Sequence, residues 1–144
     1  MTLSDYLQSE QAREDVRGLC SADGFWLING LGRLEIAQTG AWRVLWLIGE
    51  RERLAAYYRP DGDRFVVTDL GEGVRALRLR TGCSQHLAME RSDPMREALR
   101  TSGIGNVWST ERGIMELDNI TATDLPDAIC RVMLASLRVA EVSP

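Results

Sequence analysis

Glycine-containing turns at three places divide residues 25 to 68 into short apolar strands, each antiparallel to the next. The turns are Asn29-Gly30, Thr39-Gly40 and Asp61-Gly62, and Asn-Gly or Asp-Gly between apolar runs is a strong β-hairpin signal. The strand Trp42–Ile48 is apolar on both faces, which is typical of a central strand. The pattern predicts a meandering, mostly antiparallel sheet with strands over Phe25–Ile28, Leu31–Ala37, Trp42–Ile48, Leu54–Arg59 and Arg64–Thr68.

Amphipathic helices are expected at both ends of the chain. At the start, Thr2 and Asp5 have the spacing of a capping box, and an apolar stripe predicts one N-terminal helix over Thr2–Cys20. Near the end, Asp124 precedes a wide apolar stripe that continues to Ala140 and predicts a long C-terminal helix.

The first helix of a mid-chain pair is expected over Leu70–Arg80. Asp69 and Glu72 have the spacing of its N-cap and third residue, and Gly82 is placed to end it.

The second helix of the pair is expected over Pro94–Thr101, with Asp93 as its N-cap and Pro94 at the favoured first position. Residues 83–90, just before it, fit either a helix or a loop. A small hairpin is expected after it, over Val107–Thr110 and Ile114–Leu117.

These elements fit one α+β domain over residues 1–144. A chain of 144 residues has a usual length for a single domain and buries roughly two-thirds of its unfolded surface. Such a core needs no disulfide or metal ion, and neither metal nor cofactor is expected.

The charge of the chain argues against direct binding to nucleic acid. The formal net charge is −4 at pH 7, whereas a duplex-binding domain usually carries a basic surplus that contacts phosphates. All 17 basic residues are arginines. Without lysine, the chain has neither Schiff-base chemistry nor a phosphate-binding P-loop.

A cytoplasmic protein of a bacterial host, without membrane contact, is expected. The first residues contain no apolar stretch of signal-peptide length, and the longest apolar run, Val44–Ile48, is far too short to span a bilayer. The cysteines form no CxxC pair, so neither a zinc knuckle nor a thioredoxin-like motif is expected; they are Cys20, Cys83 and Cys130.

Two combinations of residues offer catalytic alternatives, and each has a simpler interpretation. Asp69 and Glu72 at a strand-to-helix junction would hold a metal ion in a nuclease, but their spacing is also that of a helix cap. Cys83 and His86 would form a nucleophile pair if they met, but no nearby motif supplies an oxyanion hole. We therefore assign no catalytic residue and favour a non-enzymatic protein.

Arginines and tryptophans are the candidate binding residues. Arg75 and Arg78 share one face of the expected helix, which is either a contact for phosphates or an acidic protein surface, or an ordinary solvated face. Trp42 and Trp46 share one face of a strand, so they belong either to the core or to an interface. Trp108 on the late hairpin is a further candidate anchor.

A longer pattern begins at Leu54, where a strand, a turn, a second strand and a helix start follow one another. Its markers are Asp61-Gly62-Asp63, Thr68-Asp69 and Gly71-Glu72, and the run from Asp127 to Val142 closes it. With these features, residues 50–142 resemble the bacterial and prophage family catalogued as domain of unknown function 1828. The resemblance implies an α+β fold and association with phages or mobile elements, and it implies no reaction.

The hypothesis favoured by these features is a non-enzymatic protein-binding regulator with another protein as its partner. Its most concrete version is a phage or mobile-element inhibitor of a host defence system, of the anti-CRISPR kind. Two alternatives stay open. One is a nucleic-acid-processing accessory protein or metal-dependent nuclease that uses Asp69 and Glu72. The other is a module that forms homodimers through the last helix or the tryptophan strand.

Overall fold

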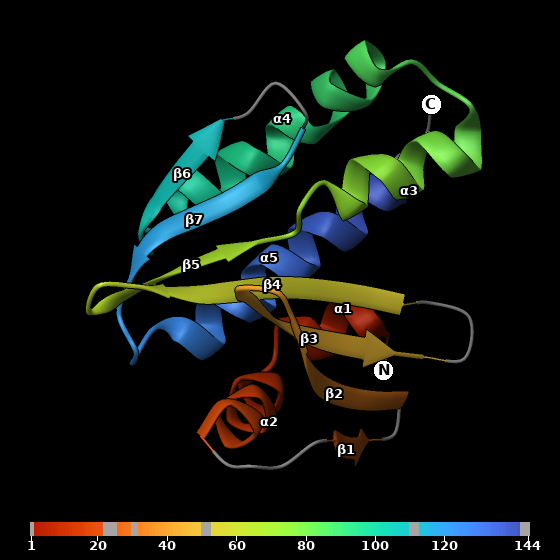
Figure 1. Ribbon diagram of the computed structural model, residues 1–144. Helices are drawn as coiled ribbons and strands as arrows, with labels where there is room; N and C mark the ends of the chain where they lie inside the picture. Colours follow the sequence, from red (N-terminus) through yellow and green to blue (C-terminus); the bar gives the residue numbers. More distant parts are fainter. Residues whose placement is uncertain (1, 22–25, 30–31, 50–52, 110–112, 142–144) are drawn as a thin grey trace.

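The computed structural model describes residues 2–21, 26–29, 32–49, 53–109 and 113–141, with only the backbone of 26–29 and 108–109. Within these ranges seven strands form one antiparallel sheet in the order β1-β2-β3-β4-β5-β7-β6 (Figure 1). The strands are β1 (Trp26–Asn29), β2 (Gly32–Thr39), β3 (Trp42–Ile48), β4 (Arg53–Asp61), β5 (Arg64–Thr68), β6 (Asn106–Ser109) and β7 (Met115–Ile120). The predicted α+β class and antiparallel meander are confirmed.

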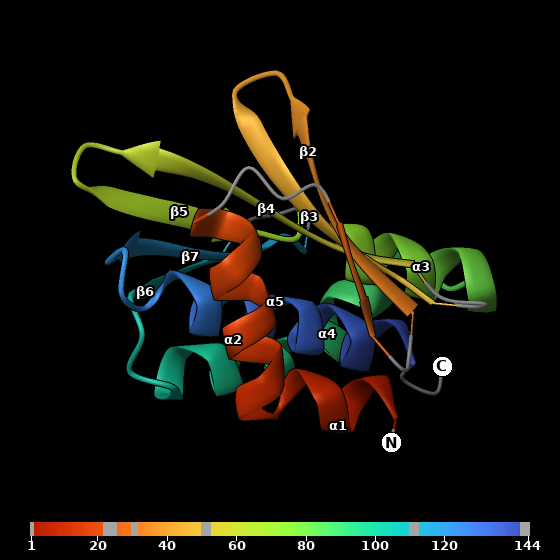
Figure 2. The ribbon, with the colours of Figure 1, turned by 90° about the horizontal axis from the view of Figure 1, so that it is seen from below.

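Helices cover one face of this sheet. The described helices are α1 (Leu3–Leu7), α2 (Glu10–Ser21), α3 (Glu72–Thr81), α4 (Gln85–Thr101) and α5 (Leu125–Ala140). α5 lies against β4, β5 and β7 and contacts the four other described helices. Figure 2 shows α1, α4 and α5 on the same side of the sheet, with no described helix over the opposite side.

The main hydrophobic core lies between the sheet and α5. Leu45 and Leu47 of β3 and Ile129 and Met133 of α5 are fully buried in it. The apolar stripe predicted for the last helix is therefore the surface on which the other elements pack. Asp124 stands at the N-cap of α5 as predicted, although its side chain makes no capping hydrogen bond there.

The single N-terminal helix predicted over Thr2–Cys20 is wrong, because the chain forms two helices with a break at Gln8 and Ser9. The Ser9 hydroxyl accepts the Ala12 N–H at 3.2 Å and donates to the Tyr6 carbonyl at 2.6 Å, so one side chain both ends α1 and starts α2. The predicted capping box of Thr2 and Asp5 is confirmed.

The predicted start of the first mid-chain helix is also wrong. Leu70 and Gly71 have left-handed backbones, with φ of 51° and 80°, so α3 begins only at Glu72 and Gly71 is its N-cap. A left-handed residue cannot continue a right-handed helix. Gly82 ends α3 as predicted.

The short helix predicted over Pro94–Thr101 is part of a longer one. α4 begins at Gln85, where the Ser84 hydroxyl accepts the Leu87 N–H, and it continues through Pro94. Asp93 is therefore not an N-cap, and the undecided residues 85–90 are helical. Ala88 and Leu99 of α4 are both buried in the main core, so packing holds the helix on both sides of the proline.

The predicted strands agree with the structure in the described ranges apart from their ends. β4 continues to Asp61 and β7 continues to Ile120. Four residues of the predicted strands and turns lie outside the described residues: Phe25, Gly30, Leu31 and Thr110.

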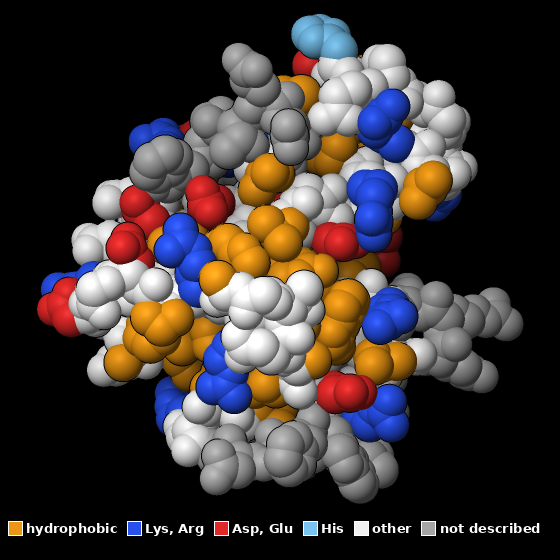
Figure 3. All heavy atoms as spheres, in the orientation of Figure 1, with side chains coloured by type: hydrophobic (Ala, Val, Ile, Leu, Met, Phe, Trp, Pro, Cys, Tyr) orange, Lys and Arg blue, Asp and Glu red, His pale blue; other side chains and the backbone are white. Residues whose placement is uncertain are grey.

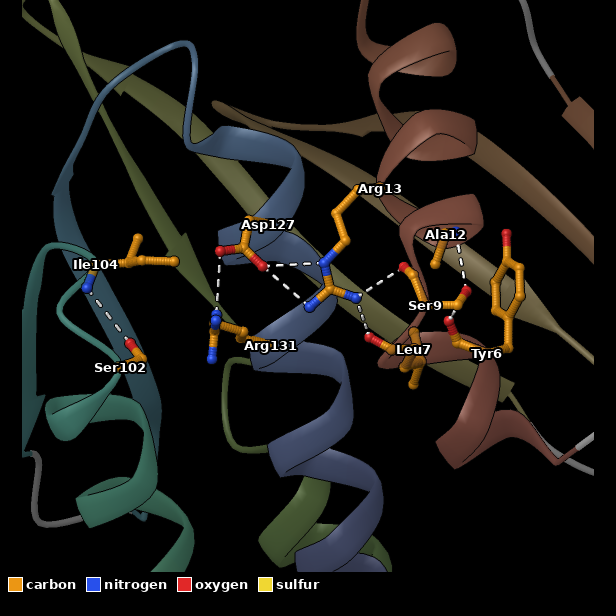
Figure 4. A network of polar contacts seen from close by, with 9 residues as sticks. All are labelled: Tyr6, Leu7, Ser9, Ala12, Arg13, Ser102, Ile104, Asp127 and Arg131. Carbon is orange, nitrogen blue, oxygen red and sulfur yellow. Dashed lines mark hydrogen bonds and ion pairs between the residues drawn. The ribbon is translucent and has the colours of Figure 1, made fainter.

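A polar network ties the two N-terminal helices to α5 (Figure 4). Arg13 of α2 donates from Nε to the Asp127 carboxylate at 3.0 Å, and the same guanidinium donates to the carbonyls of Leu7 and Ser9. Asp127 also accepts from Arg131 at 3.1 Å. Because the Arg13 side chain is only 12% exposed, these bonds fix the position of α1 and α2 on α5.

Candidate functional site

The face of the sheet opposite the helices carries a second, smaller hydrophobic cluster. Side chains alternate between the two faces of a strand, so Val44 and Trp46 point away from the main core that holds Leu45 and Leu47. We call this surface the aromatic face, and it consists of Ala37, Trp42, Val44, Trp46, Arg53, Ala55, Tyr57 and Arg59.

Aromatic rings cover the centre of this face. The rings of Trp46 and Tyr57 meet edge to face, with centroids 6.3 Å apart. Val44 is only 1% exposed, although no described helix lies above it, while Trp42 and Trp46 stay half-buried. The tryptophans thus lie outside the main core and form the outer layer of a separate cluster.

Each tryptophan of the aromatic face has an arginine over its ring. Arg53 Cζ lies 4.3 Å from the centre of the Trp46 ring, and Arg59 Cζ lies 5.0 Å from the centre of the Trp42 ring. Neither arginine forms an ion pair with a described residue. Figure 3 shows hydrophobic side chains gathered across the middle of this face, with arginines among them.

The start of α3 borders the aromatic face. Burial, followed by the nearby Glu72 carboxylate, raises the pKa of Tyr57, and the Arg75 guanidinium opposes that rise. Glu72 also pairs with Arg75 at 2.7 Å. Of the two arginines predicted on this helix, Arg75 therefore reaches the edge of the face, while Arg78 donates to Gln85 of α4 at 2.9 Å.

The tryptophans and arginines predicted from the sequence come together only in part. Trp42 and Trp46 share the aromatic face and Arg75 borders it. Trp108 pairs with Glu116 through the β6–β7 ladder, but its side chain lies outside the described part of the chain. Sequence reasoning missed Arg53, Tyr57 and Arg59. The signal was that they are separated by even numbers of residues along one strand, which places their side chains on the same face.

Asp69 and Glu72 have separate partners in the structure. The Asp69 side chain is fully buried and accepts the N–H groups of Gly71, Gly73 and Met115 at 2.8, 3.2 and 3.0 Å. Burial raises the pKa of Asp69, and these donated bonds oppose the rise. Asp69 therefore joins α3 to β7, and no group of three or more metal-ligating side chains is found among the described residues.

Cys83 and His86 also lie in different surroundings. Cys83 packs against the main core, whereas the His86 side chain is 86% exposed on α4 and lies 3.2 Å from Glu90. The described contacts therefore give no thiol and imidazole pair.

Two hollows lie along α4. The one between α4 and α5 has a volume of about 70 Å³, far below the roughly 300 Å³ of a small-molecule site. The other, of about 290 Å³, lies beside β6. Its arginines, Arg96 and Arg100, are paired with Asp93 and Glu97, so its charges are already balanced.

Comparisons with family models, curated proteins and solved structures gave no match to this chain. The resemblance of residues 50–142 stays a prediction. Among the described helices, none has both the length and the apolar character needed to cross a bilayer.

Proposed function

We propose that this chain is a non-enzymatic protein-binding regulator that docks its partner on the aromatic face. One observation carries the proposal: two half-buried tryptophans lie on the side of the sheet that no described helix covers, each beneath an arginine without an ion pair among the described residues. Tryptophan, tyrosine and arginine are the residues enriched at the energetic centres of protein interfaces.

The dimensions of the aromatic face suit the centre of an interface. Three strands about 4.8 Å apart and six residues long give a central patch of roughly 300 Å², whereas a standard interface buries about 800 Å² per partner. The rest of the contact would come from a polar rim. Charged residues around the patch supply such a rim: Arg33, Glu35, Glu72, Arg75 and Glu116.

The most concrete version of the proposal is an inhibitor of a host defence complex in the bacterial cytoplasm. It is supported by the prophage-type resemblance and by the use of Asp69 as a structural anchor rather than a metal ligand. The buried position of Asp69 also disfavours the nuclease alternative.

The proposal is tested by capturing the partner with matched variants of the tagged protein. The wild type and the variants Trp42→Ala, Trp46→Ala, Arg75→Ala and Arg78→Ala are used as bait in lysate of a bacterial host, and the eluates are analysed by mass spectrometry. Leu79→Ala is the control, since Leu79 is a large apolar residue that is 81% exposed on α3. Circular dichroism checks that each variant is folded.

We expect one stoichiometric protein that the wild type and Leu79→Ala retain and that both tryptophan variants lose. Arg75→Ala should reduce capture less, because Arg75 lies at the edge of the face. Equal capture by all variants would show that the aromatic face is not the docking surface. Absorbance of the eluate at 260 nm and sedimentation of the free protein distinguish nucleic acid and a homodimer as other occupants.

A further inference from the structure

The backbone N–H and C=O groups at the centre of the aromatic face already pair with neighbouring strands of the sheet. β3 pairs with β2 on one side and β4 on the other, and β4 also pairs with β5. Because hydrogen bonds between strands lie in the plane of the sheet, a partner cannot add a strand here and must make contacts through side chains. An α-helix satisfies its own backbone groups and commonly packs on a sheet face, as α5 does on the other side.

The two stacked arginines give the aromatic face a charge pattern. Arg53 and Arg59 lie six residues apart on β4, which is about 20 Å along a strand. Each guanidinium carbon lies over an indole ring, and the planar fork of an arginine matches a carboxylate. Between them lies the apolar centre formed by Val44, Ala55 and Tyr57.

One carboxylate, that of Glu116, interacts electrostatically with Arg59. Burial raises the pKa of Glu116, and the positive charge of the Arg59 guanidinium opposes that rise. The two groups form no ion pair. Arg53 and Arg59 are therefore both without an ion-paired carboxylate among the described residues.

We propose, on the basis of the function proposed above, that the partner places an acidic amphipathic helix on the aromatic face. Its apolar stripe covers Trp42, Trp46 and Tyr57, and carboxylates at its two ends bind Arg53 and Arg59. The backbone separation of about 20 Å between these arginines corresponds to about 13 or 14 residues of helix. Because side chains on one helix face recur every 3.6 residues, the partner helix carries acidic residues about 14 positions apart, at the two ends of its apolar stripe and on the same face.

A helix fits this surface better than a phosphate backbone does. The rim contains the carboxylates of Glu35, Glu72 and Glu116, and the whole chain has a net charge of −4. A nucleic acid would bring a continuous row of negative charges past these acids. A protein helix brings negative charge only where the arginines lie, which is the complementarity that gives interfaces their specificity.

The test uses three synthetic helical peptides of about 20 residues that share one apolar stripe. The first has glutamates about 14 positions apart, at the ends of the stripe and on the same helix face, the second has glutamines there, and the third has arginines. Binding to the full chain is measured by anisotropy of a dye on each peptide, at two salt concentrations. The variants are Trp46→Ala, the double variant with Arg53→Gln and Arg59→Gln, and the control Arg17→Gln, which changes an exposed residue of α2.

The glutamate peptide should bind at least tenfold more tightly than the glutamine peptide, and the arginine peptide should bind most weakly. The advantage of glutamate should disappear in the double arginine variant and at high salt, and persist in Arg17→Gln. Trp46→Ala should weaken both the glutamate and the glutamine peptide.

Equal binding of the glutamate and glutamine peptides, or no saturable binding of either, would overturn this inference. Tryptophan-dependent capture of a protein from lysate would in that case still support the proposed function, so the two failures are distinguishable. A homodimer that Trp46→Ala abolishes would show that a second copy of the chain occupies the aromatic face, and it would refute the inference that the partner supplies an acidic helix. Loss of binding after nuclease treatment of the captured complex would identify phosphate as the ligand instead of carboxylate.

Discussion

Replacing Asp69 by alanine should remove the hydrogen bonds that join the start of α3 to β7 and should greatly lower the free energy of unfolding. The carboxylate is fully buried and accepts three backbone N–H groups, from Gly71 and Gly73 at the start of α3 and from Met115 of β7. Alanine leaves all three without an acceptor. Each orphaned buried donor costs about 1–3 kcal/mol.

The summed cost of the three orphaned donors is reduced for two reasons. The N–H of Gly71 is only partly buried, and the variant no longer carries the energetic cost of keeping a carboxyl group away from water. We therefore expect Asp69→Ala to lower the free energy of unfolding by about 3–5 kcal/mol. Asp69→Asn keeps one carbonyl oxygen for two of the three donors and should lose about 1–3 kcal/mol.

Urea unfolding at pH 7, followed by far-ultraviolet circular dichroism, measures these differences. Glu90→Ala is the control, because the Glu90 side chain is 60% exposed and its pair with His86 should contribute under about 0.5 kcal/mol. A loss for Asp69→Ala within about 1 kcal/mol of the control would show that the carboxylate does not hold these groups. Stabilisation by millimolar Mg²⁺ in the wild type but not in Asp69→Ala would instead support the metal-site alternative.

Two further predictions concern packing and a buried thiol. Gly73→Ala should destabilise the protein by about 1–3 kcal/mol in the same urea series, because a Cβ there would lie 2.9 Å from the Ser136 carbonyl oxygen. The control Gly18→Ala should stabilise the protein by up to about 1 kcal/mol, because a Cβ at this position of α2 meets open space. Similar effects of the two substitutions would contradict close packing of α3 on α5. Burial raises the pKa of the Cys130 thiol to about 12, so a disulfide reagent at pH 8 should reach it only after unfolding. Since the folded pKa exceeds the ordinary 9.0, the stability due to the neutral thiol should fall between about pH 9 and 12, and Cys130→Ala should show a smaller fall.

The sheet could be predicted because its signals are local. Each hairpin turn lies between the two strands that it joins, and Thr39-Gly40 or Asp61-Gly62 alone fixes which strands are neighbours. The start of α3 depends instead on a distant contact. Asp69 has the spacing of a cap for a helix that begins at Leu70, but it is held by the N–H of Met115, 46 residues later, and the chain turns once more before the helix begins.

The α4 helix shows why proline was misleading. Proline at the first position of a helix and proline inside a helix have the same local sequence, and the choice depends on whether the preceding residues pack as a helix. Ala88 is buried in the main core, and Ser84 caps the helix ten residues before Pro94. Neither fact is visible in the residues around the proline.

The candidate site could be predicted only by half for a related reason. Spacing placed Trp42 and Trp46 on one face, but β3 is apolar on both faces, so the sequence did not indicate which face the helices cover. Arg53 and Arg59 were overlooked because exposed arginines on a strand usually serve solubility. Their position over the two rings follows from the register that places Ala55 beside Trp46 and carries β4 past both rings.

The contact between Arg13 and Asp127 joins two parts of the chain that are synthesised far apart in time. These residues are 114 positions apart, and closing so long a loop is slow compared with forming hairpins between neighbouring strands. Ribosomal synthesis releases α1 and α2 first, yet the helix on which they dock is made after every other described element. Among the described helices, α1 and α2 should therefore complete their packing only after α5 has been made, although α2 can pack on β1 and β2 earlier.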